Sequence, residues 1–525
     1  MAFDLSSYRE KYSDLLRDYD HIQVNLVDYA KTPYNLAIAT ARTCYSSKGV
    51  IYPHDLEKSE KSKELRDRIA RSTLEAGHVT TRQHAHFVFA ISGVSRNTIW
   101  QFLHSHPYYN SEQVSQRYVP IKAGSDWYNL PPSLRTPEGV AHMEYCFESY
   151  RELIEALTGP VSDIYFDIFR SRKANPQKYA KDIEKKAMEV ARYIMPLSTT
   201  AYLYHTISAL TFYRYVRMLE QDLLPEATAL ILKMAIELEK VDPLLIGEIP
   251  EPLEKIQKEY DPRIALEKNR TFDERLKDEN LRSLLVSHTD DIAKKIPEMA
   301  GFMRGGFVGS GDSAEPVKLS DLLDAEKNSY LSDPLYPVTL DENSRVLNHM
   351  HFTFMKKLSH TADSQEQRHR TLPGSRPDLA AQLSLENDYI VPEIIQRNPA
   401  LLSLYNNIIE KSFDVVRATC KKGVSLHDVT SLLPNAFPVR FYESGDYLNF
   451  FHKWKSRLCY NAQEEIFYST LDEVNQVEAA VPELRGFIGP PCALRKTTKP
   501  RCPEGDRYCG VKVWKLPLSE YTRVI

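Results

Sequence analysis

The pattern of hydrophobic positions divides the chain into short alternating runs and longer helical ones. Residues 21–30 (HIQVNLVDYA) alternate apolar and polar side chains, which predicts a strand with one buried face. Residues 85–93 (AHFVFAISG) are almost continuously apolar up to Gly93 and predict a buried strand. Residues 59–77 repeat apolar side chains at helical spacing and end at Gly77, which predicts an amphipathic helix. We therefore expect an α+β fold.

Longer helical patterns dominate the chain between residues 139 and 240. They include 183–195 (IEKKAMEVARYIM) and 208–222 (SALTFYRYVRMLEQD). The segment 241–280 is rich in proline and charge, which is typical of a linker between domains.

Beyond the linker the order of features recurs. Residues 284–306 resemble 24–47, and 432–466 parallel 194–231, with an offset that shrinks along the chain. Polar residues stand at matching points of the two copies: His84 with His349, Gln101 with Gln365, His104 with Arg368, and Arg217 with Arg457. We therefore predict two tandem repeats, residues 1–240 and 281–475, followed by a turn-rich C-terminal extension at 476–525.

Composition and charge are those of a globular protein and do not favour binding to nucleic acid or membranes. The chain has 525 residues, 42% hydrophobic and 26% charged, which suits a globular protein of several domains. The net charge of −4 gives no bulk attraction to nucleic acid or membranes, and no apolar run approaches the ~18 residues of a membrane span. Seven scattered cysteines and an N-terminus without an apolar signal core predict a reduced, cytoplasmic protein.

The segment Arg368-His369-Arg370 is the main candidate for chemistry. Adjacent cations repel one another, so their placement indicates an anion to receive them. Guanidinium groups pair with phosphate and carboxylate through two parallel hydrogen bonds, which makes a phosphate-bearing ligand a natural partner. The alternative is a solvated surface or a cluster of ion pairs, which is the more frequent origin of an isolated run of this kind.

Further motifs surround this segment and together resemble a known family. The first repeat has His84, SRNTIWQ (95–101), SQRYVP (115–120), Arg192 before Pro196, and Arg217. The second repeat has His349, Gln365, the Arg-His-Arg segment, His452, and Arg457 followed by Ala462-Gln463. This set resembles the flavin-dependent thymidylate synthases, over about 20–230 and 284–470.

The resemblance implies both a fold and a reaction. The fold would be a central, mostly antiparallel sheet flanked by long helices in each repeat. The reaction would be reductive methylation of dUMP to dTMP, with FAD as cofactor and with NADPH and methylenetetrahydrofolate as co-substrates. Because relatives of one repeat form tetramers, two chains of this protein are expected to form a homodimer of pseudo-tetrameric arrangement. Neither nucleic acid nor membrane is an expected partner.

The resemblance also implies roles for individual residues. The catalytic residues would be Arg457, Arg217 and Arg368. Cofactor binding would fall to Arg368, His369, Arg370, His84, His349 and His452. Substrate binding would fall to Gln101, Ser115, Gln116, Arg117, Arg192 and Gln365. No metal site and no cysteine nucleophile are implied.

Neither repeat holds the whole pattern. The first has His104-Ser105-His106 in place of Arg-His-Arg, whereas the second lacks Ser-x-Arg-Tyr and has Thr430 in place of the arginine before Pro434. The losses are complementary, so we expect a working site to draw on both repeats. Two alternatives remain: a flavin- or nucleotide-binding homologue without turnover, and a flavin-dependent methyltransferase acting on another pyrimidine.

The C-terminal extension carries three of the cysteines. Cys492, Cys502 and Cys509 do not form the Cys-x2–4-Cys pair of most zinc sites. A turn-rich hairpin with free thiols is therefore the expected structure of residues 492–515.

Overall fold

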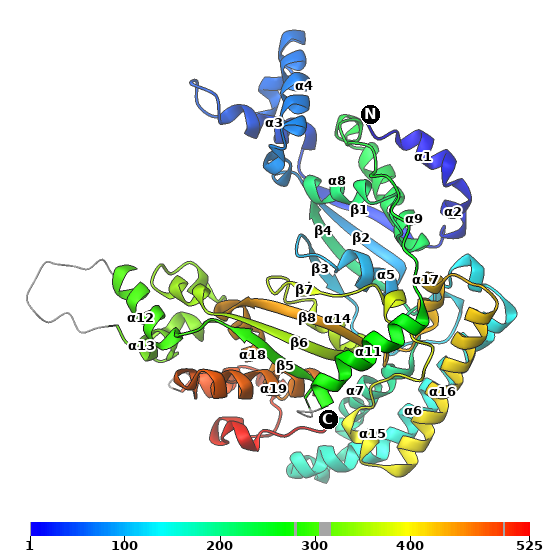
Figure 1. Ribbon diagram of the computed structural model, residues 1–525, viewed down its shortest axis with the longest axis vertical. Helices are drawn as coiled ribbons and strands as arrows, with labels where there is room; N and C mark the ends of the chain where they lie inside the picture. Colours follow the sequence, from blue (N-terminus) through cyan, green and yellow to red (C-terminus); the bar gives the residue numbers. More distant parts are fainter. Residues whose placement is uncertain (1, 278–280, 304–316, 497–498) are drawn as a thin grey trace, which may run out of the picture. The chain divides into compact units, whose positions relative to one another are not determined.

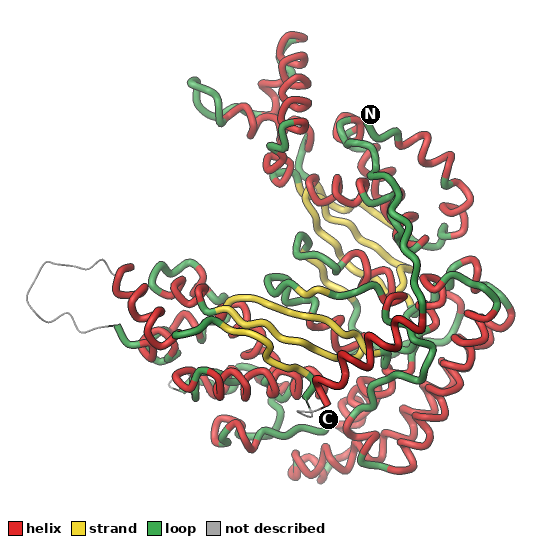
Figure 2. Tube along the Cα trace, viewed as in Figure 1, coloured by secondary structure: helices red, strands yellow, loops and turns green. Residues whose placement is uncertain are grey.

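The computed structural model describes residues 2–277, 281–303, 317–496 and 499–525 (Figures 1 and 2). The chain divides into two compact units, each built from several stretches of sequence. The first unit contains residues 1–147, 196–260 and 418–432, and the second contains 148–195, 261–417 and 433–525. Within the described ranges, no helix is both long and apolar enough to cross a membrane.

Each unit is built around a four-stranded antiparallel sheet. In the first unit the strand order is β1 (Gln23–Tyr29), β2 (His86–Ser95), β4 (Thr200–Ser208) and β3 (Asn110–Gln113). In the second unit it is β5 (Ser283–His288), β6 (His351–Ser359), β8 (Pro438–Asp446) and β7 (Gly374–Ser375). The shared order confirms the predicted repeat and the predicted α+β class.

Helices complete each unit. Those of the first unit are α1 (Leu5–Lys11), α2 (Ser13–Asp18), α3 (Pro33–Thr43), α4 (Glu60–Glu75), α5 (Arg96–Thr98), α8 (Ala209–Arg217), α9 (Pro225–Glu239), α10 (Pro243–Gly247) and α17 (Leu426–Val429). Those of the second unit are α7 (Ala180–Ala191), α11 (Pro262–Lys277), α12 (Ile292–Met303), α13 (Leu319–Leu323), α14 (His360–Glu366), α15 (Glu393–Gln396), α18 (Tyr447–Arg457), α19 (Glu464–Ala480) and α20 (Pro491–Leu494). Helices α6 (Pro137–Ile168) and α16 (Pro399–Lys421) have residues in both units.

Alternation along the strands gives each sheet a buried face. In β2 the buried side chains include Phe87 and Phe89, and they belong to the same core as α8 and α9. In β6 Phe352 and Phe354 make edge-to-face contacts with Phe450 of α18, which anchors that helix to the sheet.

Side-chain caps fix where several elements begin. The hydroxyl of Ser59 accepts the backbone N–H of Ser62 at the start of α4, which confirms the predicted helix. Ser95 and Ser359 make the same kind of contact at the ends of β2 and β6 and so begin the helices that follow. The site residues Gln101 and Gln365 lie at the same distance beyond these two caps.

Three details differ from the sequence-based expectations. Residues 200–208 form strand β4 within the region predicted as helical, because Leu203 and Ile207 face the core while Tyr202 and Tyr204 are exposed. Gly93 does not end β2; its positive φ of 77° lies at a bulge, and the strand continues to Ser95. Residues 262–277, within the predicted linker, form α11.

Helix α11 packs on the second sheet rather than spanning open solvent. Asp273 accepts hydrogen bonds from Arg440 of β8 and Lys357 of β6, at 2.7 and 2.6 Å. The ring of Phe272 makes an edge contact with Tyr442 of β8. These partners lie on two strands far from α11 in the sequence, and no local pattern in the sequence joins them to the helix.

The compact units also differ from the predicted repeat boundaries. The first unit includes 418–432 from the second repeat, where Ser198 N donates to the Ser431 carbonyl at 2.9 Å. The second unit includes 148–195 from the first repeat, where Asn435 N donates to the Met195 carbonyl at 2.8 Å. Each unit is therefore completed by a segment of the other repeat.

Candidate functional site

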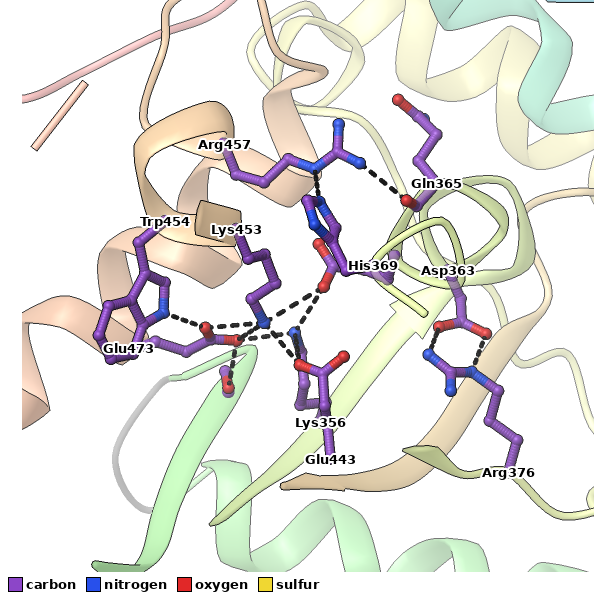
Figure 3. Close-up of polar contacts among 12 residues, drawn as sticks. Lys356, Asp363, Gln365, His369, Arg376, Glu443, Lys453, Trp454, Arg457 and Glu473 are labelled. Atoms are coloured by element: carbon purple, nitrogen blue, oxygen red, sulfur yellow. Dashed lines mark hydrogen bonds and ion pairs between the residues drawn. The ribbon is translucent and has the colours of Figure 1, made fainter. Parts of the chain in front are cut away.

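The second unit brings three of the predicted site residues together (Figure 3). Arg457 is the last residue of α18, and its Nε donates to Nε2 of His369 at 3.0 Å. Its Nη2 donates to the backbone carbonyl of Gln365 at 2.8 Å. The end of one helix thus holds the turn that carries the Arg-His-Arg segment.

This contact defines the protonation of His369. An Nε2 that accepts a hydrogen bond carries no proton, so the neutral ring is protonated on Nδ1. Burial and the charge of Arg457 both hold the pKa of His369 well below its usual range. Nδ1–H is therefore the ring donor that remains for a ligand.

The cations beside His369 are accessible. Arg368 is exposed and Arg370 is half-buried. Exposed and half-exposed guanidinium groups on either side of a neutral imidazole suit the phosphate or ring oxygens of a flavin nucleotide. By the chemistry of these donors, the segment fits the flavin that the sequence implies.

His452 and Tyr336 border the same segment. The His452 ring lies 6.1 Å from that of His369 and 4.9 Å from that of Tyr336, measured between centroids. Burial and the neighbouring Lys455 and Arg457 lower the pKa of His452. Tyr336 has a left-handed φ of 53°, a strained conformation for a non-glycine residue, which no pattern in the sequence indicates.

The predicted cofactor histidines His84 and His349 lie just before the strands rather than on them. His84 follows the short helical turn 79–83, and His349 ends the turn Ser344–His349. Both side chains are exposed. The His349 carbonyl accepts a hydrogen bond from Thr289, but its ring makes no described contact with the Arg-His-Arg segment.

A chain of hydrogen bonds leads inward from Gln365. Its side-chain amide donates to Gln463 at 2.6 Å, and the Gln463 amide donates to the hydroxyl of Tyr193. Tyr193 in turn donates to Glu465, which also accepts from the N–H and hydroxyl of Ser359. The Ala-Gln motif of the sequence therefore supports Gln365, whereas Tyr193 and Glu465 were not predicted.

Arg192 lies beside Tyr193 in the second unit. It is buried, its Nε donates to the Glu189 carbonyl at 3.2 Å, and its own carbonyl accepts from Asn435. A pocket nearby is lined by residues that include Tyr193, Gln463 and Glu464. Burial raises the pKa of Glu464 to about 7.

In the first unit, Gln101 is half-buried and bound to other residues of the protein. Its amide donates to Asn97 at 2.8 Å, and the Asn97 amide donates to the hydroxyl of Thr430 at 2.9 Å. Thr430 is the residue that replaces the expected arginine. The short hydroxyl thus takes part in a buried contact rather than reaching for a ligand.

The predicted substrate-binding residues Ser115, Gln116 and Arg117 of the first unit lie in a tight turn. The Ser115 hydroxyl accepts the N–H of Arg117 at 3.2 Å, and the Ser115 carbonyl accepts the N–H of Tyr118 and Val119. Gln116 is buried, whereas Arg117 is half-buried with its guanidinium 5.4 Å from the ring centre of Tyr118. Of the three predicted loop residues, Arg117 is the one whose side chain carries a charge.

His104 stands where the second repeat has Arg368, but it is buried. Its ring stacks on Tyr109, with centroids 4.6 Å apart and planes 3° from parallel. The Tyr215 hydroxyl lies 2.7 Å from Nε2 of His106 and 3.1 Å from Nε2 of His205. An aromatic and imidazole stack therefore fills this place in the first unit.

Arg217 is engaged with the chain that follows it. Its guanidinium donates to the Glu251 carbonyl, and its own carbonyl accepts the N–H of Leu253 at 2.9 Å. When residues are counted from the caps of α8 and α18, Arg217 corresponds to Lys455 rather than to Arg457. Its contacts are those of a structural residue.

The C-terminal extension does not form the expected hairpin. In the described part of 484–525 regular structure is limited to short helical turns. Cys459, Cys492, Cys502 and Cys509 line one small pocket as free thiols. Burial raises the pKa of Cys459 to about 12 and that of Cys492 to about 11. Across the described ranges, no group of three His, Cys, Asp or Glu side chains is arranged to hold a metal ion.

The folds and motifs define an enzyme class, and comparison with known proteins identifies it. A family profile described as "Thymidylate synthase complementing protein" matches residues 25–244 and 285–483, more than half of the chain. The chain belongs to this family, in a form with two tandem copies. The match confirms the resemblance predicted from the motifs, and the curated relatives it matches are flavin-dependent thymidylate synthases, which are enzymes.

Individual relatives are distant. The flavin-dependent thymidylate synthase of Clostridium tetani is 26% identical over 197 residues, covering 37% of this chain and 73% of its own. That of Nitratidesulfovibrio vulgaris is 33% identical over 139 residues, covering 25% of this chain and 55% of its own.

Solved structures align to about one repeat. The Helicobacter pylori flavin-dependent thymidylate synthase with FAD and dUMP has a TM-score of 0.31 at 20% identity and covers 44% of this chain and 100% of its own. A UMP/dUMP methylase from Streptomyces cacaoi, bound with 5-Br dUMP, has a TM-score of 0.30 at 15% identity, covering 43% of this chain and 97% of its own.

Proposed function

We propose that this protein is a flavin-dependent thymidylate synthase that methylates dUMP to dTMP. Methylenetetrahydrofolate would supply the carbon and NADPH the electrons. The observation that carries the proposal is the joining of Gln365, His369 and Arg457, three motif residues of the family, into one hydrogen-bonded group. Family membership supports the same reaction.

When bound, FAD would supply the hydride chemistry, and the residues of the second unit would bind and orient it. Arg368 and Arg370 would pair with anionic oxygens, and Nδ1–H of His369 would donate to an acceptor between them. Arg457 would hold that imidazole in its neutral form and add positive charge where negative charge develops. Gln365, held in place by Gln463, would line the site with a polar side chain.

For the turn at residues 115–119 of the first repeat we propose a role in substrate binding. Arg117, presented by the Ser115 turn, is proposed to bind the dUMP phosphate together with Ser115 and Gln116. For Arg217 and His104 we propose structural roles, because the first binds a backbone carbonyl and the second is stacked in the core.

We further propose that the chain works as a homodimer, with the repeats at 1–240 and 281–475 as its evolutionary units. Light scattering should give twice the 60.5 kDa of one chain. An active monomer, or a mass of four chains, would contradict this assembly.

The functional proposal is tested by rescue of a thymidine auxotroph, together with the absorbance of the purified protein. We expect growth without thymidine and a flavin spectrum. Growth should fail for Arg457→Ala, because that change removes the donor to His369. A protein that binds flavin and dUMP but neither rescues growth nor forms dTMP would be a binding homologue. Methylation of UMP in preference to dUMP would indicate the other pyrimidine substrate.

A further inference from the structure

Five ionisable side chains lie completely buried beneath the Arg-His-Arg segment (Figure 3). They come from five different elements, and each is at most 1% exposed. We call them the buried ionic cluster: Lys356 of β6, Glu366 of α14, Glu443 of β8, Lys453 of α18 and Glu473 of α19.

Each ammonium group of the cluster contacts all three carboxylates. Lys356 Nζ lies 3.1, 3.3 and 2.7 Å from oxygens of Glu366, Glu443 and Glu473. Lys453 Nζ lies 3.3, 2.5 and 3.0 Å from oxygens of the same three residues. The indole N–H of Trp454 also donates to Glu473, at 2.7 Å. The opposite charges raise the pKa of Lys356 and lower the pKa of Glu366 and of Glu473, which favours the ionised form of each of these three groups.

The cluster by itself is short of one positive charge, since it holds three carboxylates and two ammonium groups. Arg376, on the other side of α14, is paired with Asp363 through two hydrogen bonds of 2.7 Å. Arg376 also interacts electrostatically with Glu366 and Glu443, but its own charge is matched by that of Asp363. Arg457, the donor to His369, interacts electrostatically with Glu366 and supplies the positive charge that balances the formal charge of the cluster.

The first unit builds the same fold without the cluster. Counting from matched strand pairs and helix caps places Ile91, Phe102, His205, Tyr215 and Met234 at the five corresponding positions. None of these is a lysine or a glutamate, and the sheet and its helices form nonetheless. Buried charge clusters seldom stabilise a fold more than apolar packing does. Stability of the fold therefore does not explain the cluster.

The two units also differ in the segment next to these positions. The second unit carries Arg368-His369-Arg370, whereas the first carries His104-Ser105-His106. Glu366 is the last residue of α14, two positions before the segment, and its carbonyl accepts the N–H of His369 at 2.9 Å. The cluster is thus connected to His369 both directly along the chain and through Arg457.

We propose that the buried ionic cluster is a positioning network for the Arg-His-Arg segment. It holds Arg457 in place as the donor to His369, and so fixes that imidazole as the neutral tautomer with its proton on Nδ1. The significance of this tautomer for flavin binding rests on the proposed function, but the positioning itself does not.

The charges around His369 predict the direction in which its pKa should change when the cluster is altered. The groups that act on it are Arg457, Lys453 and His452 of α18, Glu366 of α14 and, through the cluster, Lys356, Glu443 and Glu473. The cations lower its pKa and Glu366 raises it. Removing the charge of Lys453 leaves a surplus of negative charge, so the pKa of His369 should rise.

The test is nitrogen NMR of the full chain labelled with [15N]histidine, in which His369→Gln assigns the ring signals. In the unaltered protein His369 should be the neutral Nδ1–H tautomer and should titrate well below the usual range of histidine. In Lys453→Met its titration should rise by about one pKa unit or more. Lys453→Arg should restore the original behaviour.

Lys455→Met is the matched control. Lys455 is buried on the same helix but donates to the Leu331 carbonyl and contacts none of the three cluster carboxylates in the described contacts. It should leave the titration of His369 unchanged. An equal shift in Lys453→Met and Lys455→Met, or no shift in either, would overturn the proposal.

Glu366→Gln provides a second test in case Lys453→Met does not fold, since glutamine keeps the shape of the glutamate side chain. It removes the carboxylate that interacts electrostatically with Arg457, and we expect the His369 signals to show a mixture of the two neutral tautomers. An unchanged single tautomer would overturn the proposal. These signals need no substrate, so absence of dTMP synthesis would refute the proposed function without altering them.

Discussion

Nε of Arg457 donates a hydrogen bond to Nε2 of His369, across 88 residues of sequence. This hydrogen bond occupies Nε2 of the central histidine with a contact inside the protein. Its other nitrogen is left to carry the proton. The Arg-His-Arg segment is therefore a set of donors with one defined imidazole form, rather than three independent cations.

Arg457→Ala should lower kcat/KM about 10²- to 10³-fold, which corresponds to roughly 3–4 kcal/mol. The loss comes from the donor to His369 and from the positive charge near the reacting groups. Arg457→Lys should be intermediate, because an ammonium cannot reproduce the fork that contacts both His369 and Gln365. Steady-state kinetics of dTMP formation measure these effects.

The matched control for that series is Arg270→Ala. Arg270 pairs with Glu386 on the surface of the same unit, and both side chains are more than half exposed. A pair of this kind contributes about 0–1 kcal/mol to stability. If Arg270→Ala impaired turnover as much as Arg457→Ala, the role given to Arg457 would be wrong.

Arg117→Ala and Arg368→Ala should each cost about 2–4 kcal/mol of transition-state stabilisation, since each removes a guanidinium from the proposed anion contacts. His104→Ala should leave kcat/KM nearly unchanged and instead lower the melting temperature, because His104 is stacked on Tyr109 in the core. Turnover, flavin content and thermal unfolding of the three variants separate these outcomes. A loss of turnover in His104→Ala equal to that in Arg368→Ala would place the working site elsewhere.

Glu464→Gln should stabilise the protein at pH 8. Burial raises the pKa of Glu464 from 4.5 to about 7, so the folded state keeps a proton that the unfolded state releases. This contribution to stability is present below pH 4.5 and is lost as pH rises to 7, a change of about 3 kcal/mol. Glutamine mimics the protonated acid and removes this pH dependence.

The measurement is the midpoint of urea unfolding at pH 5 and at pH 8. Glu483→Gln, at an exposed position of the same unit, serves as control and should not change the midpoint at either pH. Lower stability of Glu464→Gln at pH 8 than of the unaltered protein would show that Glu464 is ionised in the folded state.

The cysteines should prove dispensable for the chemistry. Burial raises the pKa of Cys459 to about 12 and of Cys492 to about 11, so neither thiol forms the thiolate of a nucleophile near neutral pH. Replacing each of the seven cysteines singly by alanine should leave a protein that still forms dTMP. A thiol reagent should modify exposed Cys44 first and the buried thiols only on unfolding. One cysteine essential for turnover would refute the mechanism.

Local patterns in the sequence were sufficient for much of the fold. The strand at 21–30, the helix at 59–77 and the recurrence of features in two repeats follow from periodicity and caps, which act over a few residues. The sequence does not predict strand β4, because exposed Tyr202 and Tyr204 alternate with buried apolar residues. Both faces of the strand therefore carry large apolar side chains, and the usual alternation of apolar and polar residues is absent. The sequence of helix α11 resembles a linker because the contacts of the helix are ionic and distant in sequence.

The candidate site divides in the same way. The Arg-His-Arg segment was visible because its cations are adjacent. The buried ionic cluster was not, because its members stand on five elements and share no spacing. Nor could the sequence show that Tyr193, from the first repeat, lies beside Gln463 in the second unit. Both features exist only once the chain has folded.

The central claim is that this chain transfers a one-carbon unit to dUMP with the help of a flavin. The most direct measurement incubates the purified protein with dUMP, NADPH, FAD and methylenetetrahydrofolate labelled at its methylene carbon, and analyses the nucleotide product. We predict labelled dTMP that depends on FAD and is reduced about 10²-fold or more in Arg457→Ala. A protein that binds FAD and dUMP but forms no labelled dTMP, or forms it equally well without flavin, would contradict the claim.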